Sequence, residues 1–331
     1  MKNPVVAVVG ATGLVGGEIV DILLERNFPY SEIRLFASEA SAGEVYEIGD
    51  DEVVIRALDA DAFAGVDLAL FAAGSQYSAE FVPLAVEQGA VVIDNSSYFR
   101  MQSEVPLIVP EVNATELSKH GGIIANPNCS TIQLVVVLAA IEKAAGLERV
   151  VVSTYQSVSG AGRVALDDLW AESVGIFNQK MPEDTCFPQQ MAFNCIPQID
   201  TFLDSGYTNE EMKVVNESRK IMNLPNLRIT ATAVRVPVFH SHAESVNVEL
   251  KTELSRDQLI DALVQEPGIS VTSEIEHYPH QVSVAGTDPV HVGRIRRDPS
   301  LQSGFDLWIV ADNVRKGAAL NAVQIAELLL E

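Results

Sequence analysis

A glycine-rich turn that directly follows an apolar run near the start of the chain is the feature that most restricts the fold. Residues 5–9 are continuously apolar and predict a buried strand, while residues 14–24 have apolar positions at helical spacing. Between them stand Gly10, Gly13 and Gly16. Such glycines allow the backbone to approach a pyrophosphate closely, and the N–H groups at the helix start can bind it. We therefore expect a dinucleotide site here, with mere tight packing of helix on strand as the alternative.

The rest of the first half continues the alternation of strands and helices. Short apolar runs at residues 33–37, 68–72, 91–93 and 122–125 are separated by helical or polar segments. Strands that alternate with helices favour parallel pairing through right-handed crossovers. The sequence predicts an α/β fold, with a doubly wound, mostly parallel Rossmann-type sheet in a dinucleotide-binding domain of residues 1–126.

Residues 127–313 have a different pattern, which predicts a second domain of the α+β type. Residues 149–155, 228–238 and 244–250 are longer runs rich in valine and threonine. They favour an antiparallel or mixed sheet with one packed face. Thr208-x-x-Glu211 is a capping box that begins a helix. A final amphipathic helix, within residues 314–331, is expected to fold back onto the first domain and complete it.

One cysteine stands where the last strand of the first half gives way to a helical pattern. Cys129 follows Asn126-Pro127-Asn128, and residues 132–145 have helical spacing, so its sulfur would lie near a helix N-terminus. The amides there stabilise a thiolate and can bind the oxyanion that forms on an attacked carbonyl. A small buried core residue is the alternative. Together with the dinucleotide turn, this cysteine predicts acyl-thioester chemistry with hydride transfer involving a nicotinamide.

The composition restricts the partners of the protein. The chain has 331 residues, 45 of them acidic and 22 basic, which gives a net charge of −23. Such a surface repels nucleic acid and anionic membranes, so neither is expected as a partner. The cysteines, Cys129, Cys186 and Cys195, lack metal-ligand spacing, so no metal site is expected. A sparse, odd set of thiols fits a reduced, cytoplasmic setting.

Several segments resemble the signature motifs of aspartate-semialdehyde dehydrogenases, in that family's order and over nearly the whole chain. They are Gly10-Ala-Thr-Gly-Leu-Val-Gly16, Asp94-Asn-Ser-Ser-Tyr-Phe-Arg100, Asn126-Pro-Asn-Cys-Ser-Thr131, Tyr155-Gln-Ser-Val-Ser-Gly160 and Arg235-Val-Pro-Val-Phe-His-Ser-His242. The resemblance implies NADPH-dependent reductive dephosphorylation of L-aspartyl 4-phosphate to L-aspartate 4-semialdehyde and inorganic phosphate, through a cysteine acyl-thioester. It places this step in lysine, threonine, methionine and diaminopimelate biosynthesis. It also implies a homodimer, with catalysis and dimerisation in the second domain.

The resemblance implies four catalytic residues. Cys129 would be the nucleophile and His242 the acid–base residue, while Gln156 and Asn128 would position the substrate or thioester. Arg235, a further residue of the implied site, precedes His242 by seven positions. Side chains separated by an odd number of positions on one strand face opposite sides. We therefore expect the chain to turn or break near Pro237 so that both side chains reach one pocket.

The resemblance also implies a set of substrate ligands. Arg100 and Lys220 would bind the phosphate, Arg235 the carboxylate and Glu217 the amino group. Arginine suits phosphate and carboxylate because its planar fork can bind either in a bidentate manner. Without the resemblance, Arg100 would be interpreted as an exposed loop residue, and Glu217 with Lys220 as an ordinary surface ion pair.

Cofactor binding is implied for residues in both domains. They are Gly10, Thr12, Gly13, Leu14, Val15, Gly16, Ser38, Ser41, Ser159, Gly160, Asn313 and Gln324. The implied cofactor is NADP(H), and similar enzymes often carry basic residues where this chain has Ala40 and Glu44. Two positive charges are thus missing near the expected place of the 2′-phosphate, so the use of NAD(H) is not excluded.

Three rival functions remain open at this stage. The sibling enzyme N-acetyl-γ-glutamyl-phosphate reductase uses the same thioester logic on a longer, acetylated substrate; the Asn-Pro-Asn-Cys-Ser-Thr motif and the pair of Glu217 with Lys220 favour the aspartyl enzyme. A non-catalytic binding paralogue would keep the fold, but Cys129, His242 and Arg235 are intact. A redox sensor at Cys129 has no resolving cysteine near it in sequence.

Overall fold

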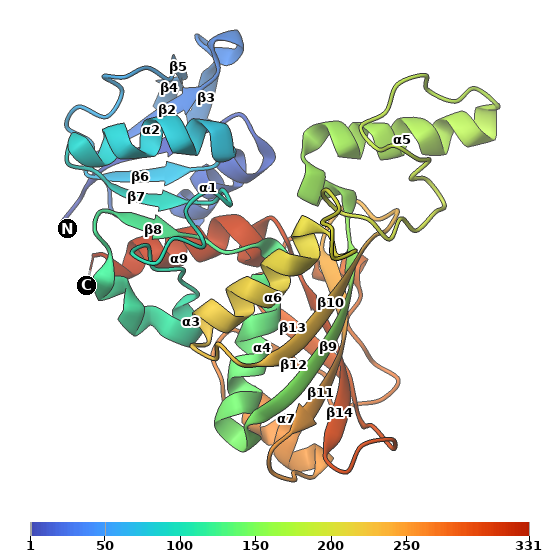
Figure 1. Ribbon diagram of the computed structural model, residues 1–331. Coiled ribbons are helices and arrows are strands. Elements are labelled where there is room, and N and C mark those ends of the chain that lie inside the picture. Colours follow the sequence, from blue (N-terminus) through green and yellow to red (C-terminus); the bar gives the residue numbers. More distant parts are fainter. Residues whose placement is uncertain (1, 50, 331) are drawn as a thin grey trace. The chain divides into compact units, whose positions relative to one another are not determined.

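Two six-stranded sheets form the framework of the protein (Figure 1). The computed structural model describes residues 2–49 and 51–330, and the chain divides into two compact units. One unit consists of Met1–Asn128 with Ala318–Glu331, and the other of Cys129–Gly317. The first has a parallel sheet and the second a mixed sheet, which confirms the predicted fold class.

The parallel sheet of the first unit has the strand order β5-β2-β1-β6-β7-β8. Its strands are β1 (Val5–Val9), β2 (Glu32–Ala37), β5 (Arg56–Ala57), β6 (Leu68–Phe71), β7 (Val91–Asp94) and β8 (Ile123–Ala125). From β1 the chain first proceeds to β2 on one side, and later strands add from β6 on the other side. The strand order therefore reverses between β1 and β6, and open α/β sheets bind ligands at the carboxyl ends of strands at such a point.

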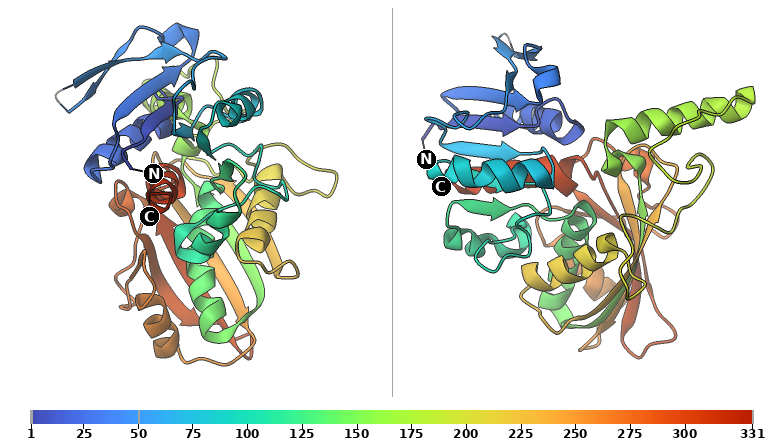
Figure 2. Two further views of the ribbon diagram at one scale, coloured as in Figure 1. Left: turned by 90° about the vertical axis from the view of Figure 1, so that its left-hand side faces the viewer. Right: turned by 45° about the horizontal axis from the view of Figure 1, so that its top comes forward.

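Helices cover both faces of this sheet. They are α1 (Leu14–Glu25), α2 (Ser75–Glu87), the short α3 (Pro110–Asn113) and α9 (Leu320–Leu328). The crossovers from β1 to β2 and from β6 to β7 run in opposite directions, so right-handed connections place α1 and α2 on opposite faces (Figure 2). On the α1 face, Ile19 and Leu23 share a buried core with Leu320 and Val323 of α9. A hairpin of β3 (Val45–Ile48) and β4 (Asp51–Val54) follows β2.

The mixed sheet of the second unit has the order β10-β9-β11-β14-β13-β12. Its strands are β9 (Leu147–Gln156), β10 (Arg228–Arg235), β11 (His242–Leu250), β12 (Ile269–Val271), β13 (Val290–Arg297) and β14 (Gly304–Ala311). β9 pairs in parallel with β10 and antiparallel with β11. Along β9, β11 and β14 buried residues largely alternate with half-buried ones, so one face of the sheet forms the core.

Three helices cover the buried face of this sheet: α4 (Cys129–Ala145), α6 (Asn209–Ile221) and α7 (Arg256–Val264) (Figure 1). α4 packs on the central strands, and α6 begins with the predicted capping box of Thr208 and Glu211. The unit also contains α5 (Arg163–Asn178) and the short α8 (Gln281–Val284). Within residues 2–49 and 51–330, none of the helices combines the length and the apolar character that crossing a membrane requires.

Candidate functional site

The glycine turn of the first unit lines a pocket at the carboxyl ends of β1, β2 and β6. The pocket has a volume of about 230 Å³, and its lining residues are Val9, Gly10, Thr12, Gly13, Ala37, Ser38, Leu58, Ala72, Ala73 and Tyr77. Several of them are residues for which the sequence implied cofactor binding. The walls combine apolar side chains with backbone groups of the turn, which is the usual make-up of a cofactor site.

Two glycines of the turn are required by its geometry. Gly10 has a φ of +84°, and a Cβ at this position would lie 2.7 Å from the carbonyl oxygen of Ala72. A Cβ on Gly16 would lie 2.0 Å from the carbonyl oxygen of Gly10. Among the described residues, no side chain caps the start of α1, where Leu14 and Val15 follow, so its first N–H groups are available to an anion. The turn therefore fits a dinucleotide pyrophosphate.

The remaining cofactor positions of the first unit lie in two places. Ser38 and Ser41 bound a short 3₁₀ turn after β2, and Ala40 and Ser38 are exposed. Gln324 lies on α9, where its amide donates to the Glu111 carboxylate at 3.2 Å. Neither Ser41 nor Gln324 is among the lining residues of the 230 Å³ pocket.

Arg100 is buried and fixed to the backbone that leads to the cysteine. Its Nε donates to the carbonyl oxygen of Asn126 at 2.9 Å, and its Nη2 to that of Asn95 at 2.8 Å. The Asn126 amide in turn donates to the Asn95 side-chain oxygen at 2.7 Å. Arg100 is thus not an exposed loop arginine. Asn128, also buried, ends the first of the two segments that form this unit.

Cys129 is the first residue of α4, and its neighbourhood combines a helix dipole with a buried cation. Burial lowers the pKa of Arg235, and the negative charge of Cys129 acts on the same guanidinium in the opposite direction. The N-terminal end of a helix likewise favours a thiolate. The backbone of Gly317 packs against the cysteine so closely that a Cβ on Gly317 would lie 3.0 Å from the Cβ of Cys129.

Arg235, Gln156 and His242 lie in one row across three adjacent strands. Gln156 pairs with Arg235 of β10 on one side and with His242 of β11 on the other, so the three side chains share the face that α4 covers. The chain leaves strand structure between Arg235 and His242, through a loop that contains Pro237. The expected break is confirmed, and it lets residues an odd number of positions apart face the same side.

His242 is completely buried and accepts a hydrogen bond at one ring nitrogen. The Ser157 backbone N–H donates to Nδ1 at 3.1 Å. A neutral imidazole that accepts at Nδ1 carries its proton on Nε2. Burial, and next the charge of Arg235, lower the pKa of His242 to about 3, so the ring is neutral near pH 7. Among the described residues Nε2 has no hydrogen-bond partner, and it would lie 3.2 Å from a Cβ placed on Gly160. His242 is therefore a hydrogen-bond donor.

Asn313 holds the segments around His242 together. Its Oδ1 accepts hydrogen bonds from the Ser157 and Ser159 hydroxyls, each at 3.1 Å, and from the Ser241 N–H at 2.9 Å. Ser241 has a φ of +70°, a strained conformation that this bond helps to hold. Asn313 and Ser159, implied as cofactor residues, thus also order the loop before His242.

Two partners of the row were not predicted from the sequence. Glu210, buried on α6, accepts a hydrogen bond from Nε2 of Gln156 at 3.3 Å and pairs with Lys213 at 3.3 Å. Ser157, the residue after Gln156, supplies the N–H that orients His242. The only local signal for Glu210 is its place within the capping box of α6. Ser157 has no local sequence signal, because it reaches His242 only through the pairing of the two strands.

The remaining substrate residues lie near the end of α6. Glu217 is buried and Lys220, one turn further along, is half-buried. A fully buried carboxylate is not an ordinary surface ion-pair member. The second unit thus contains Cys129, Gln156, Arg235 and His242 as one group and Glu217 with Lys220 on α6. Among the described residues, no group of three or more histidine, cysteine, aspartate or glutamate side chains is arranged to hold a metal ion.

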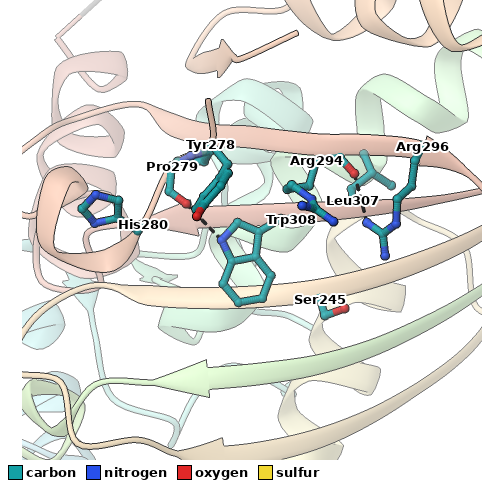
Figure 3. A pocket seen from close by; sticks show the side chains of 8 residues that line it. All are labelled: Ser245, Tyr278, Pro279, His280, Arg294, Arg296, Leu307 and Trp308. Atoms are coloured by element: carbon teal, nitrogen blue, oxygen red, sulfur yellow. Dashed lines mark hydrogen bonds between the residues drawn. The ribbon is translucent and has the colours of Figure 1, made fainter. Parts of the chain in front are cut away.

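The outer face of the second sheet carries a separate hollow of about 300 Å³ (Figure 3). Trp308 lies at its centre, and the indole N–H donates to the Pro279 carbonyl oxygen at 3.1 Å. The other lining residues are Ser245, Tyr278, His280, Arg294, Arg296 and Leu307. The hollow lies on the face opposite α4, away from the row of Gln156.

Comparison with known proteins shows the same family over both units. Residues 5–120 match the family model described as semialdehyde dehydrogenase, NAD binding domain, and residues 138–316 match semialdehyde dehydrogenase, dimerisation domain. The aspartate-semialdehyde dehydrogenase 2 of Vibrio cholerae serotype O1 is 50% identical over 328 residues, covering 98% of this chain and 97% of that protein. The aspartate-semialdehyde dehydrogenase of Aquifex aeolicus is 49% identical over 337 residues, 98% of each chain.

A solved structure gives the same result. The crystal structure of aspartate semialdehyde dehydrogenase II from Vibrio cholerae, complexed with ASA, superposes with a TM-score of 0.97 at 48% identity, covering 100% of this chain and 99% of that one.

Proposed function

The chain belongs to the aspartate-semialdehyde dehydrogenase family, and from this premise we propose that it reduces L-aspartyl 4-phosphate to L-aspartate 4-semialdehyde with NADPH, through a thioester on Cys129. The observation that carries the proposal is the placement of Cys129 at the start of α4, where it interacts electrostatically with Arg235. Arg235 pairs in register with Gln156 on the next strand, and Gln156 pairs with His242 on the strand after that. The reaction supplies the lysine, threonine, methionine and diaminopimelate routes.

The first step is attack of the Cys129 thiolate on the acyl phosphate. The α4 dipole and the Arg235 charge stabilise the thiolate, so the sulfur attacks without a separate base. The C–S bond forms, the C–O bond to phosphate breaks, and inorganic phosphate leaves with the electron pair. Arg100 and Lys220 are the proposed ligands of this phosphate, and Asn128 orients the thioester.

Arg235 is proposed to hold the substrate carboxylate, and Gln156 to position the substrate or thioester. Within the described part of the chain, the only hydrogen bond of the Arg235 guanidinium goes from Nη1 to the Ser157 carbonyl oxygen, at 2.7 Å. The rest of the fork suits a carboxylate. Because a carboxylate only accepts hydrogen bonds, the Glu210 carboxylate fixes the orientation of the Gln156 amide, with Nε2 of Gln156 towards Glu210. Glu217 is the proposed partner of the substrate amino group.

His242 is proposed to act as a neutral donor. Both thiolate attack and hydride addition produce a tetrahedral oxyanion, and the Nε2–H of His242 can donate to each. Collapse of the second oxyanion releases the aldehyde and the thiolate, so neither step consumes a proton. The tautomer therefore supports a donor role in place of the proton shuttle that the resemblance implied.

NADP(H) is the proposed cofactor, and NAD(H) is proposed to serve as well. When bound, the reduced nicotinamide cofactor would supply the hydride. The turn at Gly10 and Gly16 suits its pyrophosphate, and Ser38 lines the same pocket. Ala40 and Glu44 offer no positive charge to a 2′-phosphate, which supports weak discrimination between the two nicotinamides.

A homodimer is proposed, with a second copy of the chain on the outer face of the mixed sheet. Residues 138–316 match a dimerisation domain. On this outer face, Tyr155, Ser245 and Trp308 are only half-buried in the single chain, and Ser245 and Trp308 line the hollow of Figure 3. Half-buried aromatic side chains are the usual anchors of such interfaces.

The cytoplasm, expected from the sparse thiols, is the proposed location of the protein.

The test is the phosphate-dependent reverse reaction on L-aspartate 4-semialdehyde, followed as NADPH formation. We expect turnover with phosphate, and a loss of about a thousandfold or more in Cys129→Ala without loss of cofactor binding. Turnover of N-acetylglutamate semialdehyde in preference would instead support the sibling reductase. Cofactor binding without any turnover would support the non-catalytic paralogue.

A further inference from the structure

A second layer of polar side chains lies beneath the row of Gln156 and His242. Glu244 follows His242 by two residues on β11, so it faces the same side of the sheet. Gln133 follows Cys129 by four residues on α4, so it lies one turn further along the same helix face. Both side chains are completely buried.

None of the polar side-chain atoms of Glu244 and Gln133 has a hydrogen-bond partner among the described residues. The Gln133 amide nevertheless acts on the Glu244 carboxyl, which places the two groups together. Buried polar groups are almost always paired, because leaving them unpaired costs the desolvation of each group. An acid and an amide that face each other in this way require an explanation.

Only one protonation state satisfies both groups. A carboxylate accepts hydrogen bonds and cannot donate, so it could bond the Gln133 N–H but would leave the Gln133 carbonyl oxygen without a donor. A protonated carboxyl has one donor and one acceptor, and so does the face of a primary amide. The neutral acid and the amide can therefore form two parallel hydrogen bonds, O–H to carbonyl and N–H to carbonyl.

The surroundings of Glu244 also favour the neutral form. Burial raises its pKa well above 4.5 and the Gln133 amide opposes this, while no charged side chain of residues 2–49 and 51–330 contributes. Its cross-strand neighbours are Thr154 of β9 and Ile309 of β14, which do not ionise. On α4 and β11 the nearest titratable groups are Cys129, one turn before Gln133, and His242, which stays neutral. Glu142, Lys143 and Glu249 lie towards the other ends of these two elements.

We propose that Glu244 is a protonated acid paired with Gln133, and that this pair is a positioning device that fixes the Cys129 end of α4 to the strand of His242. The inference rests on the proposed roles of Cys129 and His242. Gln133 lies one helical turn after Cys129 on α4, and Glu244 lies two residues after His242 on β11. The pair therefore sets the distance between the sulfur and the imidazole without touching the substrate.

The protonation state is tested by stability, which needs no substrate. The unfolded chain ionises Glu244 above its ordinary pKa of 4.5, whereas the folded chain keeps it neutral. The unfolding equilibrium constant of the wild type should therefore rise relative to that of Glu244→Gln by about tenfold for each pH unit above that value, until the folded pKa is reached. Glu249→Gln, on the same strand but only half-buried, is the matched control variant. A ratio that does not change with pH, or changes in the opposite direction, overturns the proposal.

The positioning role is tested by the reactivity of Cys129. Glu244→Gln can still pair with Gln133, amide to amide, so kcat and the rate of Cys129 alkylation by iodoacetamide should stay within about threefold of wild type. Glu244→Leu breaks the pair and should lower both about tenfold, with KM unchanged. The double variant Glu244→Leu/Gln133→Leu removes both polar groups and serves if the single variant fails to fold; it should show the same loss.

Two results overturn the positioning role: full alkylation and kcat in a folded leucine variant, or an equal loss in Glu244→Gln. If the wild type lacks turnover with every semialdehyde, the proposed function fails, while the stability slope and the alkylation rates still decide on the pair.

Discussion

Replacing His242 by asparagine should change the pH dependence of stability. Burial, followed by the charge of Arg235, lowers the pKa of His242 from 6.5 to about 3. Between these values the unfolded chain binds a proton that the folded chain does not. The stability that the wild type has above the unfolded pKa is therefore lost as the pH falls from 6.5 towards the folded value. Asparagine does not titrate, so the His242→Asn variant loses nothing through this group.

The magnitude follows from the linkage of one proton. One pKa unit corresponds to about 1.4 kcal/mol, so acidification from the unfolded pKa to about pH 5 should cost the wild type about 2 kcal/mol that His242→Asn does not lose. The assay is urea unfolding of both proteins at about pH 7 and about pH 5. Comparing the two proteins at each pH removes the contribution of every other titrating group. The exposed His240, two residues earlier, gives the control variant His240→Asn.

A lowered pKa of His242 is contradicted if the stability difference between His242→Asn and the wild type is the same at both pH values within about 0.5 kcal/mol. If the free energy of unfolding of the wild type instead increases relative to that of the variant at the lower pH, His242 is a charged imidazolium in the folded protein. It would then form a thiolate–imidazolium pair with Cys129. The activity gives a second readout: kcat should fall in His242→Asn, while the acidic limb of its pH profile stays in place, because His242 does not titrate there.

Three further substitutions test separate parts of the account. Gly317→Ala places a methyl group 3.0 Å from the Cβ of Cys129, so the rate of Cys129 alkylation and kcat should each fall about tenfold; unchanged rates would show that the cysteine is not held there. Ala40→Arg should raise kcat/KM for NADPH about tenfold and leave that for NADH unchanged, as steady-state titrations would show; a similar gain for both would place the 2′-phosphate elsewhere. Ser245→Arg, on the outer face of the mixed sheet, should halve the mass measured by light scattering, whereas the exposed control Thr115→Arg should not; a full-size Ser245→Arg would exclude this face as the interface.

Local patterns were enough to predict several elements of the fold and part of the site. The apolar run and glycine turn predicted β1 and the start of α1, and the capping box predicted α6. The break between Arg235 and His242 followed from strand geometry. The strand nevertheless ends at Arg235, earlier than the apolar run to residue 238 suggested, because Pro237 cannot continue the ladder.

Other elements have no clear local pattern. The register of β13 shifts between Gly293 and Arg296, which interrupts the alternation of buried and exposed residues along the strand. α5 exposes the large apolar side chains of Trp170 and Phe177, so it lacks the usual division into a buried and a solvent face. α4 is apolar on nearly all sides because it lies under other helices as well as on the sheet. The periods that identify strands and helices are weak in such segments.

The partners of the site residues depend on contacts between distant segments. Ser157 meets His242 and Glu210 meets Gln156 only because three strands and α6 come together in one register. A one-residue shift of β9 would turn Gln156 to the other face of the sheet and separate it from Glu210. The residue types that carry chemistry can thus be identified from motifs, whereas the tautomer of His242 follows only from the folded arrangement.

The most direct test of the central claim is a rapid-mixing experiment without phosphate. Enzyme, NADP⁺ and L-aspartate 4-semialdehyde are mixed, NADPH formation is followed, and the quenched protein is analysed by peptide mass spectrometry. If Cys129 is the nucleophile, a burst of about one NADPH per chain should appear, and an aspartyl adduct should accumulate on the Cys129 peptide until phosphate is added. Normal steady-state turnover with phosphate, but neither burst nor adduct without it, would contradict a thioester on this cysteine.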